Sequence, residues 1–380
     1  MNKPIGLYIH VPFCIRKCLY CDFCSDAGAT PAQMHAYADA LLLEMGANAS
    51  CVSHRCVESV FFGGGTPTLL PLDELARILD FIRKHFSLSP DAEITLEANP
   101  ASIDAQGLAA LRRMGFNRIS VGVQSMVDRE LSHLGRVHTA SDAYAFLKDA
   151  REAGFQNINV DVMYGIPHQS ASSFLETVDT LLRFSPEHIS AYSLILEEGT
   201  PFFAHRQELP LPSEDEEEKM YSMLCERLRA AGYEHYEISN FAKAGYECRH
   251  NLLYWHSEEY LGFGVAAYSF LDSTRYGNHR DRLAYVASPL DAVTDKEVLT
   301  PLDRAYEYIM LRLRLSEGIL LSEYERLFGI KIGVRYRSLI TQLAQMGWMK
   351  EAEGRIFLTE AGMRFSNTVL VAFLEEHQKT

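Results

Sequence analysis

The chain has 380 residues, 47% of them hydrophobic and 23% charged, and its formal net charge at pH 7 is −14. This composition predicts a soluble α/β protein of more than one domain and excludes a disordered chain, and the acidic charge disfavours broad binding to nucleic acid. The sequence has no run of about 18 apolar residues and no secretory signal, so we expect a cytoplasmic protein with reduced cysteines.

Six short β-rich runs predict six buried strands. They begin at Ile5, Val57, Glu93, Arg118, Asn157 and His188. Helical patterns separate them, and three of the helices end in a Gly followed by an aromatic residue, at Gly115, Gly154 and Gly232. Because strands that alternate with helices form parallel sheets with right-handed crossovers, the pattern predicts an open sheet or an incomplete (β/α) barrel.

The regular alternation weakens after Pro201. Ser213 is expected to cap a helix that begins with an acidic run. Further on, helices are expected at 303–315, 321–328 and 334–346, and a β-hairpin follows them, as in a winged helix. These changes predict three domains, at residues 1–235, 236–300 and 301–380.

Three cysteines, Cys14, Cys18 and Cys21, form a CxxxCxxC motif directly after the first predicted strand, and Cys24 follows. Three thiolates suit a [4Fe–4S] cluster that keeps one iron without a protein ligand. Four thiolates would suit zinc, although structural zinc sites usually draw on two separate pairs. An unrelated group of thiols is the third alternative.

Polar or glycine-rich segments follow the other predicted strands. Gly63 to Gly65 remove side chains, so their backbone amides and carbonyls could hold the ammonium and carboxylate of an amino acid. The later strand ends offer Glu97, Asn99, Gln124 and Asp161, and Arg136 could pair with a carboxylate. Since active sites of β/α barrels lie at the carboxyl ends of the strands, we expect these groups around one barrel mouth.

These motifs resemble those of a known family. The CxxxCxxC motif with Tyr20 before its third cysteine, followed by "GGGTP", resembles the radical S-adenosylmethionine (SAM) superfamily. The segments "YIHVPFC", "LEANP", "VGVQS", "GRVHT" and "DVMYGIP" are similar to those of the oxygen-independent coproporphyrinogen III oxidase-like family. The segments "YEISNFAKAGYECRHNLLYW" and "YLGFGVAAYS" resemble its HemW branch of heme chaperones.

The resemblance covers nearly the whole chain and implies an α/β fold. The implied architecture is an incomplete (β/α)6 TIM-like radical SAM barrel, followed by a C-terminal α+β extension that contains "HNLLYW" and by a winged-helix-like domain. The implied cofactors are a [4Fe–4S] cluster, SAM and heme, and the implied cluster ligands are Cys14, Cys18 and Cys21.

The resemblance also implies residues that bind the other cofactors. The positions matching SAM contacts are Tyr8, Tyr20, Gly64, Gly65, Thr66, Glu97, Gln124, Arg136, Asp161 and Ile195. His250, in "HNLLYW", matches a heme contact, since a His beside aromatic residues can be an axial ligand. It can equally be a structural His, and Cys248 is a second candidate for heme.

The implied function is a heme chaperone that passes heme to hemoproteins, some of them membrane-associated. The chaperone itself is expected in the cytoplasm or at the membrane periphery, as a monomer or a homodimer. An oxidase that decarboxylates coproporphyrinogen III is the alternative. Two departures argue against it: Phe23 replaces the oxidases' fourth cysteine, and there is no room for their N-terminal extension. A more distant alternative is a radical SAM enzyme that acts on RNA and grips it with residues 302–380.

Overall fold

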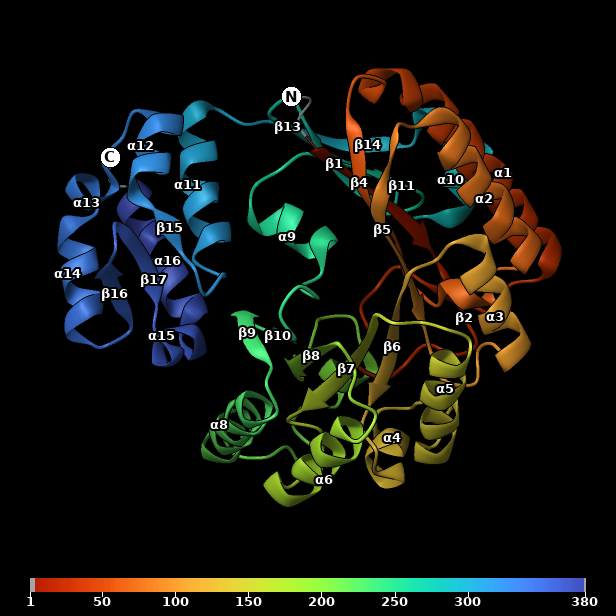
Figure 1. Ribbon diagram of the computed structural model, residues 1–380, viewed down its shortest axis with the longest axis horizontal. Helices are drawn as coiled ribbons and strands as arrows, with labels where there is room; N and C mark the ends of the chain where they lie inside the picture. Colours follow the sequence, from red (N-terminus) through yellow and green to blue (C-terminus); the bar gives the residue numbers. More distant parts are fainter. Residues whose placement is uncertain (1–3, 379–380) are drawn as a thin grey trace.

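The computed structural model describes residues 4–378, and Figure 1 shows how its elements are arranged. Six parallel strands lie side by side in chain order and confirm the six that the sequence predicts. They are β1 (Pro4–Val11), β4 (Cys56–Gly64), β5 (Leu88–Ala98), β6 (Arg118–Gln124), β7 (Ile158–Tyr164) and β8 (His188–Ser193). The last strand stops at Ser193, three residues before the end of the predicted run.

Helices connect these strands and cover one face of the sheet (Figure 1). They include α1 (Pro31–Asn48), α2 (Leu72–His85), α3 (Ala105–Met114), α5 (Ala140–Glu152) and α6 (Ala171–Leu182), and α8 (Glu214–Ala230) follows the last of the six strands. The caps follow the sequence: the Ser213 side chain accepts a hydrogen bond from the backbone N–H of Glu216. The three predicted glycines all adopt positive φ where helices end, as at Gly115, where φ is 105°.

Residues beyond the sixth parallel strand extend the same sheet at both edges. At one edge, β11 (Tyr260–Phe263) pairs in parallel with β1 and continues into three antiparallel strands, β12 (Tyr268–Leu271), β13 (Thr274–Asn278) and β14 (Val293–Val298). At the other edge lie β10 (Asn240–Ala242) and β9 (Glu234–Glu237). Because the described residues form no pairing between β14 and β9, the sheet is open, as an incomplete barrel requires.

The main hydrophobic core runs through both the parallel strands and this extension, and it includes Tyr285 and Ala292. The predicted boundary at residue 235 therefore falls within one continuous sheet and core. The division into three domains stays a prediction.

The C-terminal region has a separate core, built around Tyr324, Tyr336 and Phe373. Its helices are α11 (Pro301–Arg312), α12 (Leu321–Phe328), α13 (Ile332–Arg335), α14 (Arg337–Gln345), α15 (Glu360–Arg364) and α16 (Ser366–Gln378). A three-stranded sheet is formed by β15 (Ile319–Leu320), β17 (Arg355–Leu358) and β16 (Met349–Ala352). Figure 1 shows the short helix α9 (Arg249–Trp255) between this region and the main sheet.

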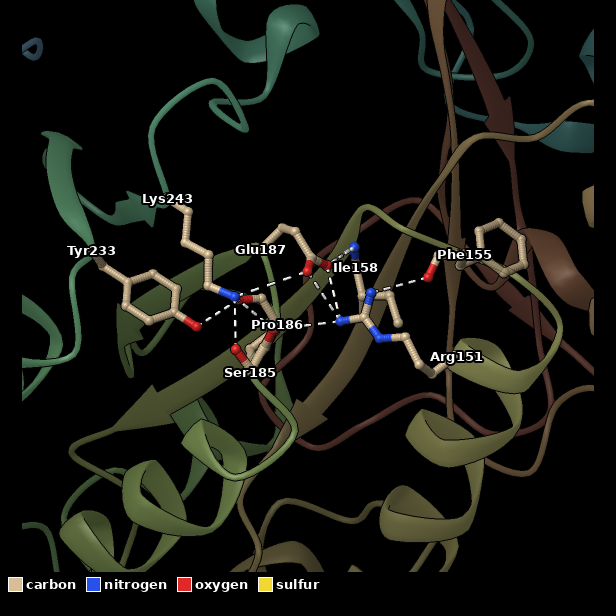
Figure 2. Close-up of polar contacts among 8 residues, drawn as sticks. All are labelled: Arg151, Phe155, Ile158, Ser185, Pro186, Glu187, Tyr233 and Lys243. Carbon is tan, nitrogen blue, oxygen red and sulfur yellow. Dashed lines mark hydrogen bonds and ion pairs between the residues drawn. The ribbon is translucent and has the colours of Figure 1, made fainter.

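A polar cluster ties the amino ends of β7 and β8 to their neighbours (Figure 2). The Glu187 carboxylate accepts hydrogen bonds from Arg151 Nη2, at 3.0 Å, and from the backbone N–H of Ile158, at 3.1 Å. Lys243, just after β10, lies 3.9 Å from the same carboxylate and donates to the backbone oxygen of Ser185. The cluster therefore joins α5, β7, β8 and β10 at the end of the sheet opposite the cysteine loop.

Within the described residues, no helix combines the length and the apolar character needed to cross a membrane.

Candidate functional site

A cavity opens at the carboxyl ends of the parallel strands and is called the first cavity below. The cysteine loop after β1 forms one side of it, and the ends of β4, β5, β6 and β7 form the other. Its lining includes most of the predicted site residues: Cys14, Cys18, Cys21, Tyr20, Gly64, Gly65, Thr66, Glu97, Gln124, Arg136 and Asp161. The folded chain therefore brings together groups that lie up to about 150 residues apart in the sequence.

The three cysteines of the motif are free and half-buried in this lining. Cys14 Sγ lies 3.7 Å from Thr66 Oγ1, and Cys18 Sγ lies 3.5 Å from Arg136 Nη1. Burial, together with the neighbouring thiols of Cys18 and Cys14, raises the pKa of Cys21 to about 11. Three adjacent thiols can ligate the irons of an iron–sulfur cluster, and the Arg136 guanidinium beside them complements its negative charge.

The described residues do not form a site for a single metal ion. No three His, Cys, Asp or Glu side chains within residues 4–378 converge closely enough to hold one ion. Cys24, the fourth thiol considered for zinc, lines a neighbouring cavity and not the first one.

The glycines after β4 are needed for close packing. Gly64 has a φ of 107°, and a Cβ there would lie 2.5 Å from the His10 ring. A Cβ on Gly65 would lie 2.7 Å from the backbone oxygen of Phe13. The amides of Gly64, Gly65 and Thr66 already donate within the protein, to Glu97, Val11 and Phe13 respectively. These three amides therefore have partners within the protein, and the expectation that Gly63 to Gly65 hold the amino-acid part of a ligand stays a prediction.

Two carboxyl groups, those of Glu97 and Asp161, line the first cavity. Burial, followed by the charge of Asp161, raises the pKa of Glu97 to about 8, although a 3.1 Å hydrogen bond from the Gly64 amide opposes the shift. Burial also raises the pKa of Asp161, and a 2.7 Å hydrogen bond from Asn159 Nδ2 opposes it. Such groups are characteristic of functional sites, because a bound cation would stabilise the charged forms that burial disfavours.

Arg136 lies between the thiols and the strand ends. It donates to the backbone oxygen of Gly122, at 2.6 Å, and to Asn99 Oδ1. Its Nε is buried and has no hydrogen-bond partner among the described residues, so the site leaves one donor unsatisfied. Gln124 occupies the end of β6 with a φ of 68°, a strained backbone conformation that residues other than Gly rarely adopt.

Two predicted SAM residues lie outside the first cavity. Tyr8 lines the neighbouring cavity, with its hydroxyl 3.0 Å from His10 Nδ1. Ile195 is 64% exposed, lies beyond the end of β8 at Ser193 and lines neither cavity.

The neighbouring cavity, called the second cavity below, has a volume of about 540 Å³, which is within the range of small-molecule sites. It shares Phe23, Gly64 and Glu97 with the first cavity, so the two adjoin at the barrel mouth. Its walls come from the cysteine loop, α9, β11 to β13 and α11. Local sequence patterns do not reveal this cavity, because the cysteine loop and the segments from α9 onward that enclose it are more than 200 residues apart.

His250 lies behind the wall of the second cavity. It is 1% exposed, and its ring nitrogens lie 2.8 Å from Ser59 Oγ and 2.8 Å from the Tyr254 hydroxyl. Burial lowers its pKa to about 3. Cys248 is fully buried, with its pKa raised by burial to about 12. In this structure both residues satisfy a structural role, and the predicted heme contact stays a prediction.

The comparisons with known proteins agree with this geometry. Residues 8–181 match the family model of the Radical SAM superfamily, and residues 299–365 match that of the HemN C-terminal domain. The protein named heme chaperone HemW from Bacillus subtilis is 35% identical over 375 residues, which cover 97% of this chain and 99% of the relative. Its namesake from Escherichia coli is 35% identical over 381 residues, covering 98% and 99% of the two chains.

Among solved structures, the coproporphyrinogen III oxidase HemN from Escherichia coli, described as a radical SAM enzyme, superposes with a TM-score of 0.87 and 25% identity. The match covers 98% of this chain and 90% of the oxidase. The cysteine motif, the open barrel and the full-length similarity lead to one conclusion. The chain belongs to the radical SAM superfamily, whose members use a [4Fe–4S] cluster and SAM, and within it to the HemW family.

Proposed function

We propose that this protein is a heme chaperone that binds a [4Fe–4S] cluster, SAM and heme and delivers the heme to hemoproteins. The observation that carries the proposal is the 35% identity, over nearly the full length, to proteins named heme chaperones. A second cavity beside the cofactor cavity supports it, because a chaperone needs room for its cargo next to a site that can sense or control it.

In this proposal Cys14, Cys18 and Cys21 hold the cluster. SAM occupies the first cavity, where the carboxyl groups of Glu97 and Asp161 attract its positive charge. When bound, the cluster and SAM together supply one-electron cleavage of the sulfonium. Arg136 positions the loop from the side of Cys18, and the glycines after β4 let the loop pack closely.

We propose that His250 contributes to heme binding through Tyr254. Tyr254 lines the second cavity, and its hydroxyl is bonded to His250 Nε2. The His ring therefore fixes the phenol in the cavity wall, and direct contact with heme requires the phenol to swing aside. A His250→Ala variant is expected to bind heme more weakly than wild type.

We further infer that the recipients are hemoproteins, some of them at membranes, reached from the cytoplasm or the membrane surface. The sequence leaves both a monomer and a homodimer open. Size-exclusion chromatography with light scattering, with and without heme, distinguishes the two.

Coproporphyrinogen oxidation is the second candidate function, favoured by the TM-score of 0.87 to an oxidase. One pair of assays separates the two functions. Hemin is titrated into the anaerobically reconstituted protein, and the same preparation is incubated with coproporphyrinogen III, SAM and a reductant. A saturable Soret band without protoporphyrinogen formation supports the chaperone. Protoporphyrinogen formation, or no heme binding by a protein with an intact cluster, contradicts it.

A further inference from the structure

The second cavity has the walls expected of a site for a flat aromatic ligand. Seven Phe, Tyr and Trp side chains line it: Tyr8, Phe23, Tyr254, Trp255, Tyr260, Tyr268 and Phe270. They come from five segments of the chain, so the cavity exists only in the folded protein. The buried indole N–H of Trp255 has no hydrogen-bond partner among the described residues, which leaves an unsatisfied donor in the wall.

The charges around this cavity are uneven. Arg275 lines it but is already paired with Glu307, at 2.8 Å. The guanidinium of Arg280 also lines it and forms no hydrogen bond or ion pair with any residue between 4 and 378. Asp22 and Glu258 line it as well, and their negative charge repels an anion from their side. An anionic group on a ligand would therefore lie at Arg280.

Few side chains in the lining of the second cavity are free to ligate a heme iron. His10 lines the cavity, but its ring nitrogens lie 3.0 Å from the Tyr8 hydroxyl and 2.8 Å from the backbone oxygen of Cys24. The hydroxyls of Tyr8 and Tyr254 are likewise occupied. Cys24 is half-buried, and its thiol makes only a weak hydrogen bond, 3.2 Å long, to the backbone oxygen of Arg280.

Two further phenols line the cavity: that of Tyr260 is hydrogen-bonded to Arg275, and that of Tyr268 belongs to a residue that is 44% exposed. A thiol that is half shielded from water, next to an unpaired cation, is the better placed iron ligand, and thiolate is a known axial ligand of heme.

We propose that the second cavity is the heme site, that Arg280 pairs with a propionate, and that Cys24 supplies a thiolate ligand to the iron. The inference rests on the proposed function, because the relatives' name is what identifies heme as the cargo. As the Fe–S bond forms, the thiol proton passes to solvent and no electron is transferred. The aromatic walls stack on the macrocycle, and the "HNLLYW" segment contributes two of them, Tyr254 and Trp255.

The test uses full-length protein reconstituted anaerobically with its cluster and titrated with hemin. Heme difference spectra remove the absorbance of the cluster. Wild type is expected to show the electron paramagnetic resonance of low-spin ferric heme with a thiolate ligand, and the red-shifted Soret band of its ferrous carbonyl form. Cys24→Ser should lose both signatures at unchanged cluster iron and sulfide. The matched control Cys51→Ser, at an exposed thiol, should keep them.

Arg280→Gln is expected to keep the thiolate signature and to raise the Kd for hemin about threefold, as for a partly exposed ion pair. The control Arg113→Gln, at an exposed position outside both cavities, should leave the Kd unchanged. Because Arg280 is exposed, this variant tests the site even if Cys24→Ser fails to fold.

The contrary outcomes are distinct. A thiolate signature that survives in Cys24→Ser, or heme bound by wild type without that signature, overturns the ligand assignment. An unchanged Kd in Arg280→Gln overturns the propionate contact. If His250→Ala loses heme while Cys24→Ser and Arg280→Gln bind it as wild type does, heme does not bind in the second cavity. The proposed chaperone function would still hold. If wild type binds no heme, the proposed function itself fails.

Discussion

Replacing Glu97 with Gln should make the stability of the cofactor-free protein less dependent on pH. Burial and the charge of Asp161 raise the pKa of Glu97 from 4.5 to about 8 in the folded protein. The folded state therefore binds a proton that the unfolded chain releases above about pH 4.5. The free energy of unfolding falls as pH rises from there to about 8, and this cost is fully present above that value.

The size of the effect follows from the pKa. A change from 4.5 to about 8 corresponds to about 5 kcal/mol at most, and coupling to Asp161 makes this an upper bound. Between about pH 5.5 and about pH 9, wild type should lose roughly 3 kcal/mol more of its unfolding free energy than Glu97→Gln. Glu58→Gln, at an exposed position on β4, is the control and should follow wild type.

Urea unfolding of the cofactor-free proteins at a series of pH values measures this difference, with circular dichroism as the signal. The reasoning is refuted if the difference in unfolding free energy between wild type and Glu97→Gln is the same at every pH. It is also refuted if the variant becomes relatively less stable as pH rises.

Three further predictions concern packing, the ion-pair cluster and the cysteines. Gly64→Ala should lower the free energy of unfolding, measured with urea, by at least about 2 kcal/mol, because its Cβ would meet the His10 ring. The control Gly28→Ala, at positive φ in open space, should lower it by only about 1 kcal/mol. Equal losses in the two variants would contradict the packing argument. Glu187→Gln should lower the unfolding free energy by about 1–3 kcal/mol, because Arg151 and Lys243 lose their charged partner. The control Glu152→Gln, in an exposed ion pair with Lys148, should change it by less than about 0.5 kcal/mol. Cys18→Ser should lose most of its cluster iron and labile sulfide after anaerobic reconstitution, and Cys51→Ser should lose none; full iron content in Cys18→Ser would remove this cysteine from the cluster.

The parallel strands and their helices could be predicted because their signals are local. A buried run such as the one from Ile5, or a Gly that ends a helix, reports its structure within a few residues. The first cavity could be predicted from the rule that the carboxyl ends of parallel strands converge. Of the thirteen residues predicted to bind the cluster or SAM, twelve line the first or the second cavity. Ile195 did not, because the sequence gives no sign that β8 ends at Ser193.

The edge strands and the second cavity could not be predicted in the same way. Strands β9 to β13 have only three to five residues each, and every residue of β14 is exposed, so neither length nor hydrophobic alternation marks them. The pairing of β11 with β1 joins residues about 250 positions apart. The burial of His250 behind Tyr254 depends on that pairing and on α9, and a motif alone does not show it.

The central claim is that this protein gives heme to other proteins. The most direct measurement loads the full-length protein with heme, removes free heme, and mixes it with an apo-hemoprotein that is resolved from it by size. The account predicts that the Soret absorbance moves to the recipient, faster than from albumin loaded with the same amount of heme. Heme that stays on the protein, or transfer no faster than from albumin, would contradict it.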